Sequence, residues 1–335
     1  MSENWVTASA PGKFVIMGEH AVVYGEPAMV LAIDRRISCS VRRNPYNTLN
    51  GESIDFNRQP HFRYLTRNLH HAMAFQTSSE IPAGSGLGSS AALSASLALA
   101  LRARRNLPFD EQELVLESYN AELYAQGNGS PMDASACVHG KGVLVNMDGK
   151  GSKHLWTIAR GERTWKVDEV DSPPMSFVIG NTGIRAPTGP QVEKVRRYTN
   201  RSKFARGIVE EIGSVTRDGY LALARNDAEA LGRLMTRDHK LLSILGVSCK
   251  ELNKLVSATL PYSYGAKLTG SGGGGCMVAL TDYPEKVADI INGRGGTAYI
   301  VHTGVEGART EDGPTDYPPL SIPKDMYYGK DREAP

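Results

Sequence analysis

The hydrophobic pattern near the start of the chain predicts two strands. Residues 27–33, PAMVLAI, form a continuous apolar run, as in a buried strand. Residues 37–41, ISCSV, alternate apolar and polar side chains at the period of a half-buried strand. The polar segment DRR between them allows a tight connection, so we expect a hairpin.

The next two regular segments predict helices. Residues 89–105, SSAALSASLALALRARR, contain no Gly or Pro and are rich in helix formers, so we expect a helix with a largely buried face. A second helix is predicted after Asp110, which can cap it. Glu113 lies three residues further on, and Gly127 can end the helix.

The rest of the chain mixes strands and helices without strict alternation, which favours an α+β fold over a doubly wound sheet. The further predicted strands are residues 142–147, 175–181, 266–270, 276–281 and 297–303. The further predicted helices are residues 202–218, 227–243, 248–259 and 283–293. Residues 311–335 are rich in Pro and charge and predict a tail that is weakly packed or disordered.

Composition narrows the class of protein. The chain has 335 residues, 41% hydrophobic and 22% charged, with a net charge of +2 and no long charged tract, so we expect no nucleic-acid partner. We find no apolar export signal at the N-terminus and no apolar run long enough to span a bilayer. Four scattered cysteines favour free thiols in a cytoplasmic protein.

Candidate chemistry begins in residues 81–93, IPAGSGLGSSAAL, where three glycines lead directly into a predicted helix. A glycine cluster is most often a simple turn. Here, however, backbone N–H groups without Cβ atoms and a helix N-terminus together can cradle a phosphate. The stretch lacks the GK[ST] ending of a Walker A loop and the strand with an acidic residue that follows a dinucleotide-binding loop.

Two more segments accompany this loop. Residues 10–25, APGKFVIMGEHAVVYG, place Lys13, Glu19 and His20 near a strand. Residues 267–280, KLTGSGGGGCMVAL, place a second glycine-rich loop between two strands. Four consecutive glycines give up side-chain packing, so we expect something bulky against them or an unusual bend.

In order and spacing, the stretches PGKxxxxGEHAVVYG, IPAGSGLGSSAAL and KLTGSGGGGCMVAL resemble the three motifs of the GHMP small-molecule kinases, most closely the mevalonate kinases of archaeal type. The resemblance implies a two-domain α+β fold. Residues 1–175 would form an ATP- and Mg²⁺-binding domain like domain 2 of ribosomal protein S5, and residues 176–310 a ferredoxin-like domain. The tail at 311–335 is not covered by the family pattern.

The same resemblance implies ATP-dependent phosphorylation of the 5-hydroxyl of mevalonate, an early step in isoprenoid biosynthesis, with Mg²⁺. Ser90 and Glu122 would hold the metal. Asp133, eleven residues after Glu122, would be the general base, and Lys13 would contact the reacting hydroxyl. Substrate-binding residues carried over are Lys13, Glu19, His20, Asp133 and Thr188. The phosphate loop carried over is Pro82, Ala83, Gly84, Ser85, Gly86, Leu87, Gly88, Ser89, Ser90, Ala91 and Ala92.

Local sequence alone favours simpler interpretations: a solvated Glu122, a turn-capping Asp133 and a core His20. The three motifs together reverse that preference. The segment that begins at Asp133, DASACVHGKG, departs from the family pattern at Cys137, His139 and Lys141. The sequence therefore does not decide the shape of the site beside Asp133. Alternatives are another GHMP kinase, such as one acting on phosphomevalonate, or an inactive ligand sensor. A homodimer is common in the family, but the sequence leaves the oligomeric state open.

Overall fold

The computed structural model describes residues 4–82, 85–127, 129–147, 152–315, 317–318 and 320. It divides into two compact units, each discontinuous in sequence. Unit 1 comprises Met1–Gly12, Arg35–Gly140 and Glu306–Pro335, and unit 2 comprises Lys13–Asp34 and Lys141–Val305. Strands β1 (Val6–Met17) and β2 (Ala28–Arg43) contribute residues to both units. The domain boundary expected near residue 175 stays a prediction.

The predicted hairpin at residues 34–36 is wrong, because β2 runs without interruption from Ala28 to Arg43. In unit 2, its first residues pair antiparallel with β6 (Gly142–Val145). In unit 1, Ile37–Arg43 pair antiparallel with β5 (Met73–Ser79). The polar residues do not turn the chain, because Arg36 finds acceptors for its guanidinium while its backbone stays extended.

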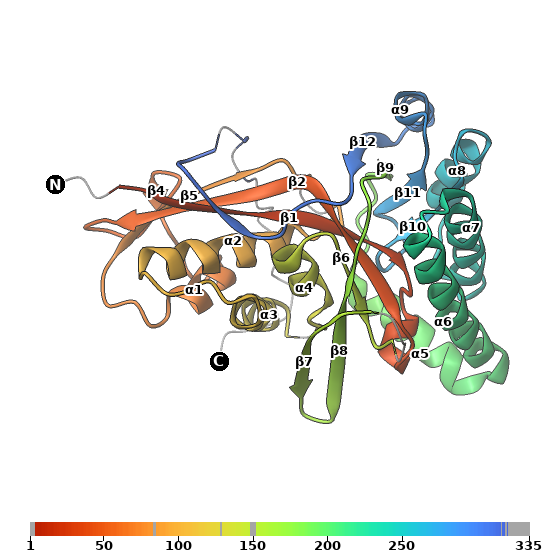
Figure 1. Cartoon of the computed structure of the whole chain (residues 1–335), viewed down its shortest axis with the longest axis horizontal. Coiled ribbons are helices and arrows are strands. Elements are labelled where there is room, and N and C mark those ends of the chain that lie inside the picture. Colours follow the sequence, from red (N-terminus) through yellow and green to blue (C-terminus); the bar gives the residue numbers. More distant parts are fainter. Residues whose placement is uncertain are drawn as a thin grey trace. The chain divides into compact units, whose positions relative to one another are not determined.

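Among its described residues, unit 1 combines sheet strands with four helices, which gather on one side of β2 and β5 (Figure 1). Besides β5, its shorter strands are β3 (Thr48–Leu49), β4 (Glu52–Ser53) and β13 (Arg309–Glu311). The helices are α1 (Pro60–Thr66), α2 (Ser89–Arg104), α3 (Glu111–Gln126) and α4 (Met132–His139).

The two predicted helices of unit 1 are present, and the predicted caps of α3 are confirmed. Helix α2 is buried along most of its length, which explains its apolar residues on every face. At the start of α3 the Asp110 side chain accepts a hydrogen bond from the Glu113 N–H, and Gly127 ends the helix in the left-handed conformation. The Glu113 carboxylate pairs with Arg102 at 2.6 Å, which joins α3 to α2.

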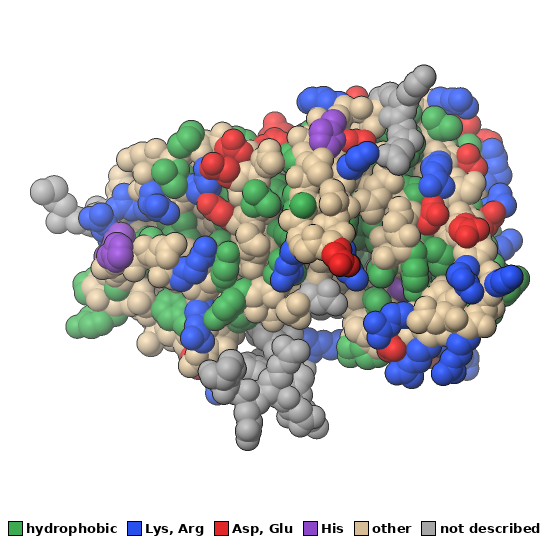
Figure 2. Space-filling model, turned by 90° about the horizontal axis from the view of Figure 1, so that it is seen from below, with side chains coloured by type: hydrophobic (Ala, Val, Ile, Leu, Met, Phe, Trp, Pro, Cys, Tyr) green, Lys and Arg blue, Asp and Glu red, His purple; other side chains and the backbone are tan. Residues whose placement is uncertain are grey.

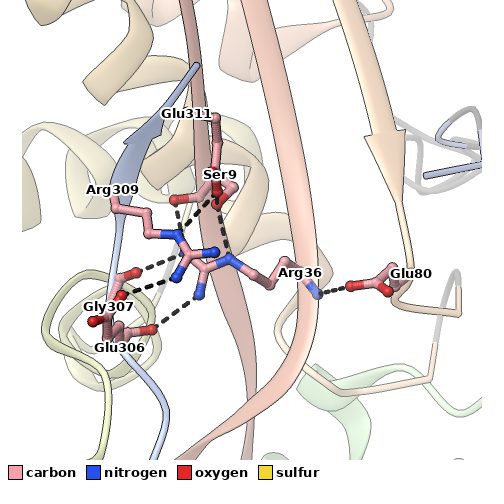
Figure 3. Close-up of polar contacts among 7 residues, drawn as sticks. All are labelled: Ser9, Arg36, Glu80, Glu306, Gly307, Arg309 and Glu311. Atoms are coloured by element: carbon pink, nitrogen blue, oxygen red, sulfur yellow. Dashed lines mark hydrogen bonds and ion pairs between the residues drawn. The ribbon is translucent and has the colours of Figure 1, made fainter. Parts of the chain in front are cut away.

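Arg36 joins β2 to the chain segment that precedes β13 (Figure 3). Its buried guanidinium donates to the Ser9 hydroxyl at 2.8 Å and to the carbonyls of Glu306 and Gly307 at 3.0 and 2.7 Å. Its backbone N–H donates to Glu80 at 3.1 Å. A buried guanidinium is tolerated only when its N–H groups have acceptors, and these acceptors come from distant parts of the sequence.

The described residues beyond β13 continue along β5. The Ser79 N–H donates to the Pro318 carbonyl at 2.6 Å, and the Leu320 N–H donates to the Thr77 carbonyl at 3.3 Å. The hydroxyls of Ser78 and Thr315 lie 2.9 Å apart. The predicted tail therefore starts with residues that are hydrogen-bonded to unit 1, while residues 316, 319 and 321–335 lie outside the described residues.

Unit 2 contains a four-stranded antiparallel sheet in the order β10-β11-β9-β12. Its strands are β9 (Ser176–Asn181), β10 (Gly265–Thr269), β11 (Cys276–Leu280) and β12 (Thr297–His302). The helices are α5 (Thr188–Arg201), α6 (Lys203–Ala224), α7 (Ala228–Ile244), α8 (Lys250–Thr259) and α9 (Pro284–Gly293). This order of strands and helices is the split βαβ arrangement, so the ferredoxin-like prediction is confirmed.

All the strands and helices predicted in unit 2 are present, with ends that differ by a few residues. The sequence analysis missed helix α5 and the hairpin of β7 (His154–Arg160) and β8 (Arg163–Val170). In this hairpin the buried residues Trp156, Ile158, Trp165 and Val167 alternate with exposed ones, a pattern that the sequence analysis did not pick out.

Within the described part of the chain, no helix has both the length and the apolar character needed to cross a membrane. The face in Figure 2 carries acidic and basic side chains among hydrophobic ones, which agrees with the balanced net charge of +2.

We predict that Arg36→Ala destabilises the protein by about 3 kcal/mol, because it removes the donors of buried carbonyl and hydroxyl groups. Urea unfolding followed by circular dichroism measures this loss. Arg58→Ala is the control, since Arg58 is 70% exposed and should change stability by less than about 0.5 kcal/mol. Equal stability of the two variants would contradict the role given to Arg36.

Candidate active site

The first glycine loop leads into α2 in unit 1. Gly86 and Gly88 both have φ of 76°, a conformation that favours glycine, and a Cβ on Gly86 would meet nothing within 4 Å. Gly88 occupies the N-cap position of α2 and offers no side chain to the first N–H groups of the helix. The loop therefore presents open backbone donors at a helix N-terminus, as an anion site requires. Ala83 and Gly84 lie outside the described residues.

Ser90, in the first turn of α2, lies against Glu122 of α3. The Ser90 Oγ is 2.6 and 2.8 Å from the two carboxylate oxygens of Glu122. Ser94 and Gln126 also donate to this carboxylate, both at 2.9 Å. The structure thus brings Ser90 and Glu122 together, although they are 32 residues apart in sequence, and their metal-binding role stays a prediction.

The sequence analysis missed His61, which completes this cluster from α1. Its Nε2 lies 2.8 Å from a Glu122 oxygen and 3.0 Å from the Ser90 hydroxyl, and its side chain is 1% exposed. Burial alone would raise the pKa of Glu122, but the charge and hydrogen bond of His61 and the serine hydroxyls lower it below its usual value. Glu122 is therefore ionised at neutral pH.

This pair of oxygen ligands suits a hard cation such as Mg²⁺. The Ser90 hydroxyl can donate its proton to Glu122 and keep its lone pairs for a metal, and Glu122 supplies a negative charge. Among the described residues, no three His, Cys, Asp or Glu side chains are grouped so that they could hold a metal by themselves. A cation here would complete its shell with phosphate and water oxygens, as Mg²⁺ commonly does.

Asp133 and Lys13 lie in different units, and their catalytic roles stay predictions. Asp133 is half-buried in the first turn of α4. Lys13 lies in β1 with 5% of its side chain exposed. A lysine as deeply buried as this one needs acceptor groups close by.

The three unusual residues after Asp133 are used in packing and pairing. Cys137 is buried in α4. The His139 ring lies 2.9 Å from a Glu111 oxygen, and the Lys141 ammonium pairs with Asp171 at the same distance.

In unit 2, the second glycine loop follows β10 and packs closely on its neighbours. A Cβ on Gly272 would lie 2.1 Å from the Val247 carbonyl oxygen, and one on Gly273 would lie 2.3 Å from the Gln191 amide nitrogen. A Cβ on Gly274 would lie 2.5 Å from the Ile184 carbonyl oxygen. The expectation of something bulky against these glycines is confirmed, and the bulk comes from unit 2 itself.

His20 is tied to this loop. The residue has φ of 62°, and its Nε2 lies 2.9 Å from the Ser271 carbonyl oxygen, which accepts the hydrogen bond. Burial lowers the pKa of His20, so the ring is neutral at pH 7. Its neighbour Glu19 is buried and pairs with Lys267 of β10, a residue that the sequence analysis did not single out. Thr188 is exposed at the start of α5.

Comparison with known proteins agrees with these features. The family model of the GHMP kinases N terminal domain matches residues 59–141, and that of the GHMP kinases C terminal matches residues 221–296. The chain is 33% identical to a mevalonate kinase of Methanothermobacter thermautotrophicus, over 85% of this chain and 92% of that protein. It is 31% identical to a mevalonate kinase of Pyrococcus abyssi, over 92% of this chain and 98% of that protein.

Solved structures show the same fold. The L. major mevalonate kinase in complex with R-mevalonate has a TM-score of 0.76 at 22% identity, covering 88% of this chain and 94% of that one. The Methanococcus jannaschii mevalonate kinase has a TM-score of 0.74 at 23% identity, covering 90% and 99%. The chain belongs to the GHMP kinases and, within that family, to the mevalonate kinases.

We predict that Gly272→Ala destabilises the protein by about 3 kcal/mol, because it combines a strained backbone with a clash against a carbonyl oxygen. Gly270→Ala is the matched control. Gly270 has φ of 82° but open space around its Cβ position, so only the strain of about 1 kcal/mol remains. Urea unfolding of the two variants measures the difference, and equal losses would contradict close packing at Gly272.

Proposed function

We propose that the protein transfers the γ-phosphoryl group of ATP to the 5-hydroxyl of mevalonate and releases 5-phosphomevalonate and ADP. The observation that carries the local chemistry is the Ser90–Glu122 pair at the N-terminus of α2, directly behind an open glycine loop. An anion site beside an ionised carboxylate and a hydroxyl is the arrangement that a metal-bound triphosphate requires.

The glycine loop, Pro82 to Ala92, would hold the phosphates of ATP through backbone N–H groups. Ser90 and Glu122 would hold Mg²⁺, which when bound neutralises charge on the β- and γ-phosphates. His61 and Ser94 help to lower the pKa of Glu122, and Gln126 donates a further hydrogen bond to its carboxylate. We infer that His61 acts through Glu122 and Ser90, which it contacts, rather than directly on the phosphates.

Asp133 is the proposed general base. It would accept the proton of the mevalonate 5-hydroxyl as that oxygen bonds to the γ-phosphorus and the bond to the ADP oxygen breaks. Lys13 would stabilise the negative charge that develops on the attacking oxygen. In unit 2, Glu19, His20 and Thr188 would bind mevalonate, and the neutral His20 ring offers it a hydrogen-bonding group.

We also propose that the protein works in the cytoplasm. All four of its cysteines are free thiols in the described structure, as in a reducing compartment. A homodimer is proposed from the family resemblance alone, and light scattering of the purified chain tests it.

The reaction is tested by ADP release from Mg·ATP with mevalonate, 5-phosphomevalonate, galactose, homoserine or no acceptor. We predict turnover with mevalonate and rates at the no-acceptor level with the others. Turnover with 5-phosphomevalonate instead would keep the phosphoryl-transfer site and reject the proposed acceptor. Absence of turnover with every acceptor, in a protein that still binds ATP, would favour a ligand sensor.

We predict that Asp133→Asn lowers kcat by about 10²–10⁴-fold, because the amide cannot accept the hydroxyl proton. The unfolding midpoint should change little, since the two side chains have nearly the same shape. Asp171→Asn is the control, because Asp171 is 82% exposed and lies on the surface of unit 2. Near wild-type turnover in Asp133→Asn would reject the general base.

A further inference from the structure

Unit 2 buries two carboxylates against a single lysine. Glu19 follows β1, Asp238 lies on α7 and Lys267 lies on β10, and the three side chains are 2%, 0% and 0% exposed. The Lys267 ammonium pairs with one Glu19 oxygen and lies 3.3 Å from an Asp238 oxygen. With both acids ionised, the cluster would carry one net negative charge in the protein interior, which is very unfavourable.

The cluster also lacks hydrogen-bond donors. Lys267 has three N–H groups, and it uses one on Glu19 and one on the Leu268 carbonyl at 2.8 Å. Within the described structure, one oxygen of Glu19 and both oxygens of Asp238 are buried without a well-formed hydrogen bond, and the Lys267 ammonium approaches Asp238 only to 3.3 Å. The two carboxyl groups lie within hydrogen-bonding reach of each other, so one added proton would supply a donor and remove the excess charge.

The neighbouring histidines do not supply a positive charge that would balance the second carboxylate. His239 of α7 accepts a hydrogen bond from the Leu268 N–H at its Nδ1, and its Nε2 lies 3.0 Å from the Asn253 side-chain oxygen. These partners fix a neutral ring. Burial and the charge of Lys267 lower the pKa of His239 to about 4. Burial likewise lowers the pKa of His20, so both histidines are neutral at pH 7.

We propose that Glu19 and Asp238 share one proton at neutral pH, and that this proton makes Asp238 a positioning residue for the turn that carries Glu19 and His20. The consequence for substrate binding rests on the proposed function, in which that turn contacts mevalonate. Asp238, on α7, acts on the turn through Glu19. Asp238 therefore does not need to touch the substrate itself.

The direction of the pH dependence follows from the burial of the pair. Burial raises the pKa of Glu19 to about 8, Lys267 partly opposes this, and Asp238 raises it further. Burial also raises the pKa of Asp238. The folded protein keeps the shared proton up to about pH 8, whereas an exposed glutamate releases it near 4.5. Stability from this proton is therefore fully present below pH 4.5 and is lost progressively up to about pH 8.

The turn has little freedom to adapt when the proton leaves. A Cβ on Gly18 would lie 2.3 Å from the Pro27 carbonyl oxygen, so the backbone is already closely packed there. The Glu19 carbonyl accepts a hydrogen bond from the Ala21 N–H at 2.7 Å, and His20 is bonded to Ser271. Repulsion between two ionised carboxylates would therefore be transmitted to the backbone of residues 18–20.

The proton is tested by urea unfolding between pH 5 and 9. We expect the unfolding equilibrium constant of the wild type, relative to that of Asp238→Asn, to rise about tenfold per pH unit up to about pH 8. Asn keeps the shape, removes one negative charge and offers an N–H donor to Glu19. Glu229→Gln is the matched control on α7, since Glu229 is 74% exposed, and it should follow the wild type. Parallel profiles of wild type and Asp238→Asn would overturn the proposal.

Glu19→Gln covers the case in which Asp238→Asn does not fold. Gln supplies permanently the donor that the proton provides, so this variant should also lack the pH step. If its unfolding profile runs parallel to that of the wild type, the proposal is overturned.

The positioning role is tested by the pH profile of kcat/KM for mevalonate. We expect the wild-type value to fall about tenfold per pH unit above about pH 8. We expect Asp238→Asn to lack this fall, because its Glu19 is already ionised beside Lys267. Identical kinetic profiles would remove the positioning role. If neither protein phosphorylates mevalonate, the proposed function fails, while the unfolding profiles still decide whether the proton is shared.

Discussion

A carboxylate that is taken out of water must find its hydrogen-bond donors inside the protein, and this constraint organises both clusters described above. Glu122 meets it with donors from Ser90, Ser94, His61 and Gln126, and it is ionised. Glu19 has one lysine, which it shares with Asp238, and it retains a proton in our account. The same side chain thus takes opposite protonation states because of the number of donors around it.

Glycine has a different structural role in each of the two glycine loops. Around Gly86 the space is open, so the missing side chain leaves backbone N–H groups accessible to an anion. Around Gly272 to Gly274 the space is filled by backbone and side chains of unit 2, so the missing side chains permit close packing. Sequence alone could not separate these uses, because both stretches consist of small residues in turns.

Much of the fold could be predicted from the sequence. Helices α2, α3 and α6 to α9 and the apolar strands of unit 2 were correctly predicted, because composition, hydrophobic pattern and, at α3, capping signals agree there. The hairpin at residues 34–36 was wrong, because a polar segment suggested a turn while the Arg36 contacts that keep β2 extended come from residues 9, 306 and 307. Short helices such as α1 and α4 carry too few residues for a clear period.

The site was predicted mainly through the family resemblance. Ser90 and Glu122 meet as that resemblance implies, yet His61 gives no signal in its own segment, PHFRYLT, that it will lie against them. Asp238 and Lys267 were missed for the same reason, because burial of a charge depends on contacts between α7, β10 and the turn after β1. Tertiary contacts, rather than local pattern, define these residues.

The most direct test of this account is a carbon-13 NMR titration of the glutamate side-chain carboxyls, with Glu19 and Glu122 assigned through their Gln variants. The account predicts that Glu122 stays ionised from pH 5 to 9, while Glu19 keeps its proton to about pH 8. A Glu19 signal that titrates near 4.5, the ordinary value for an exposed glutamate, would contradict it.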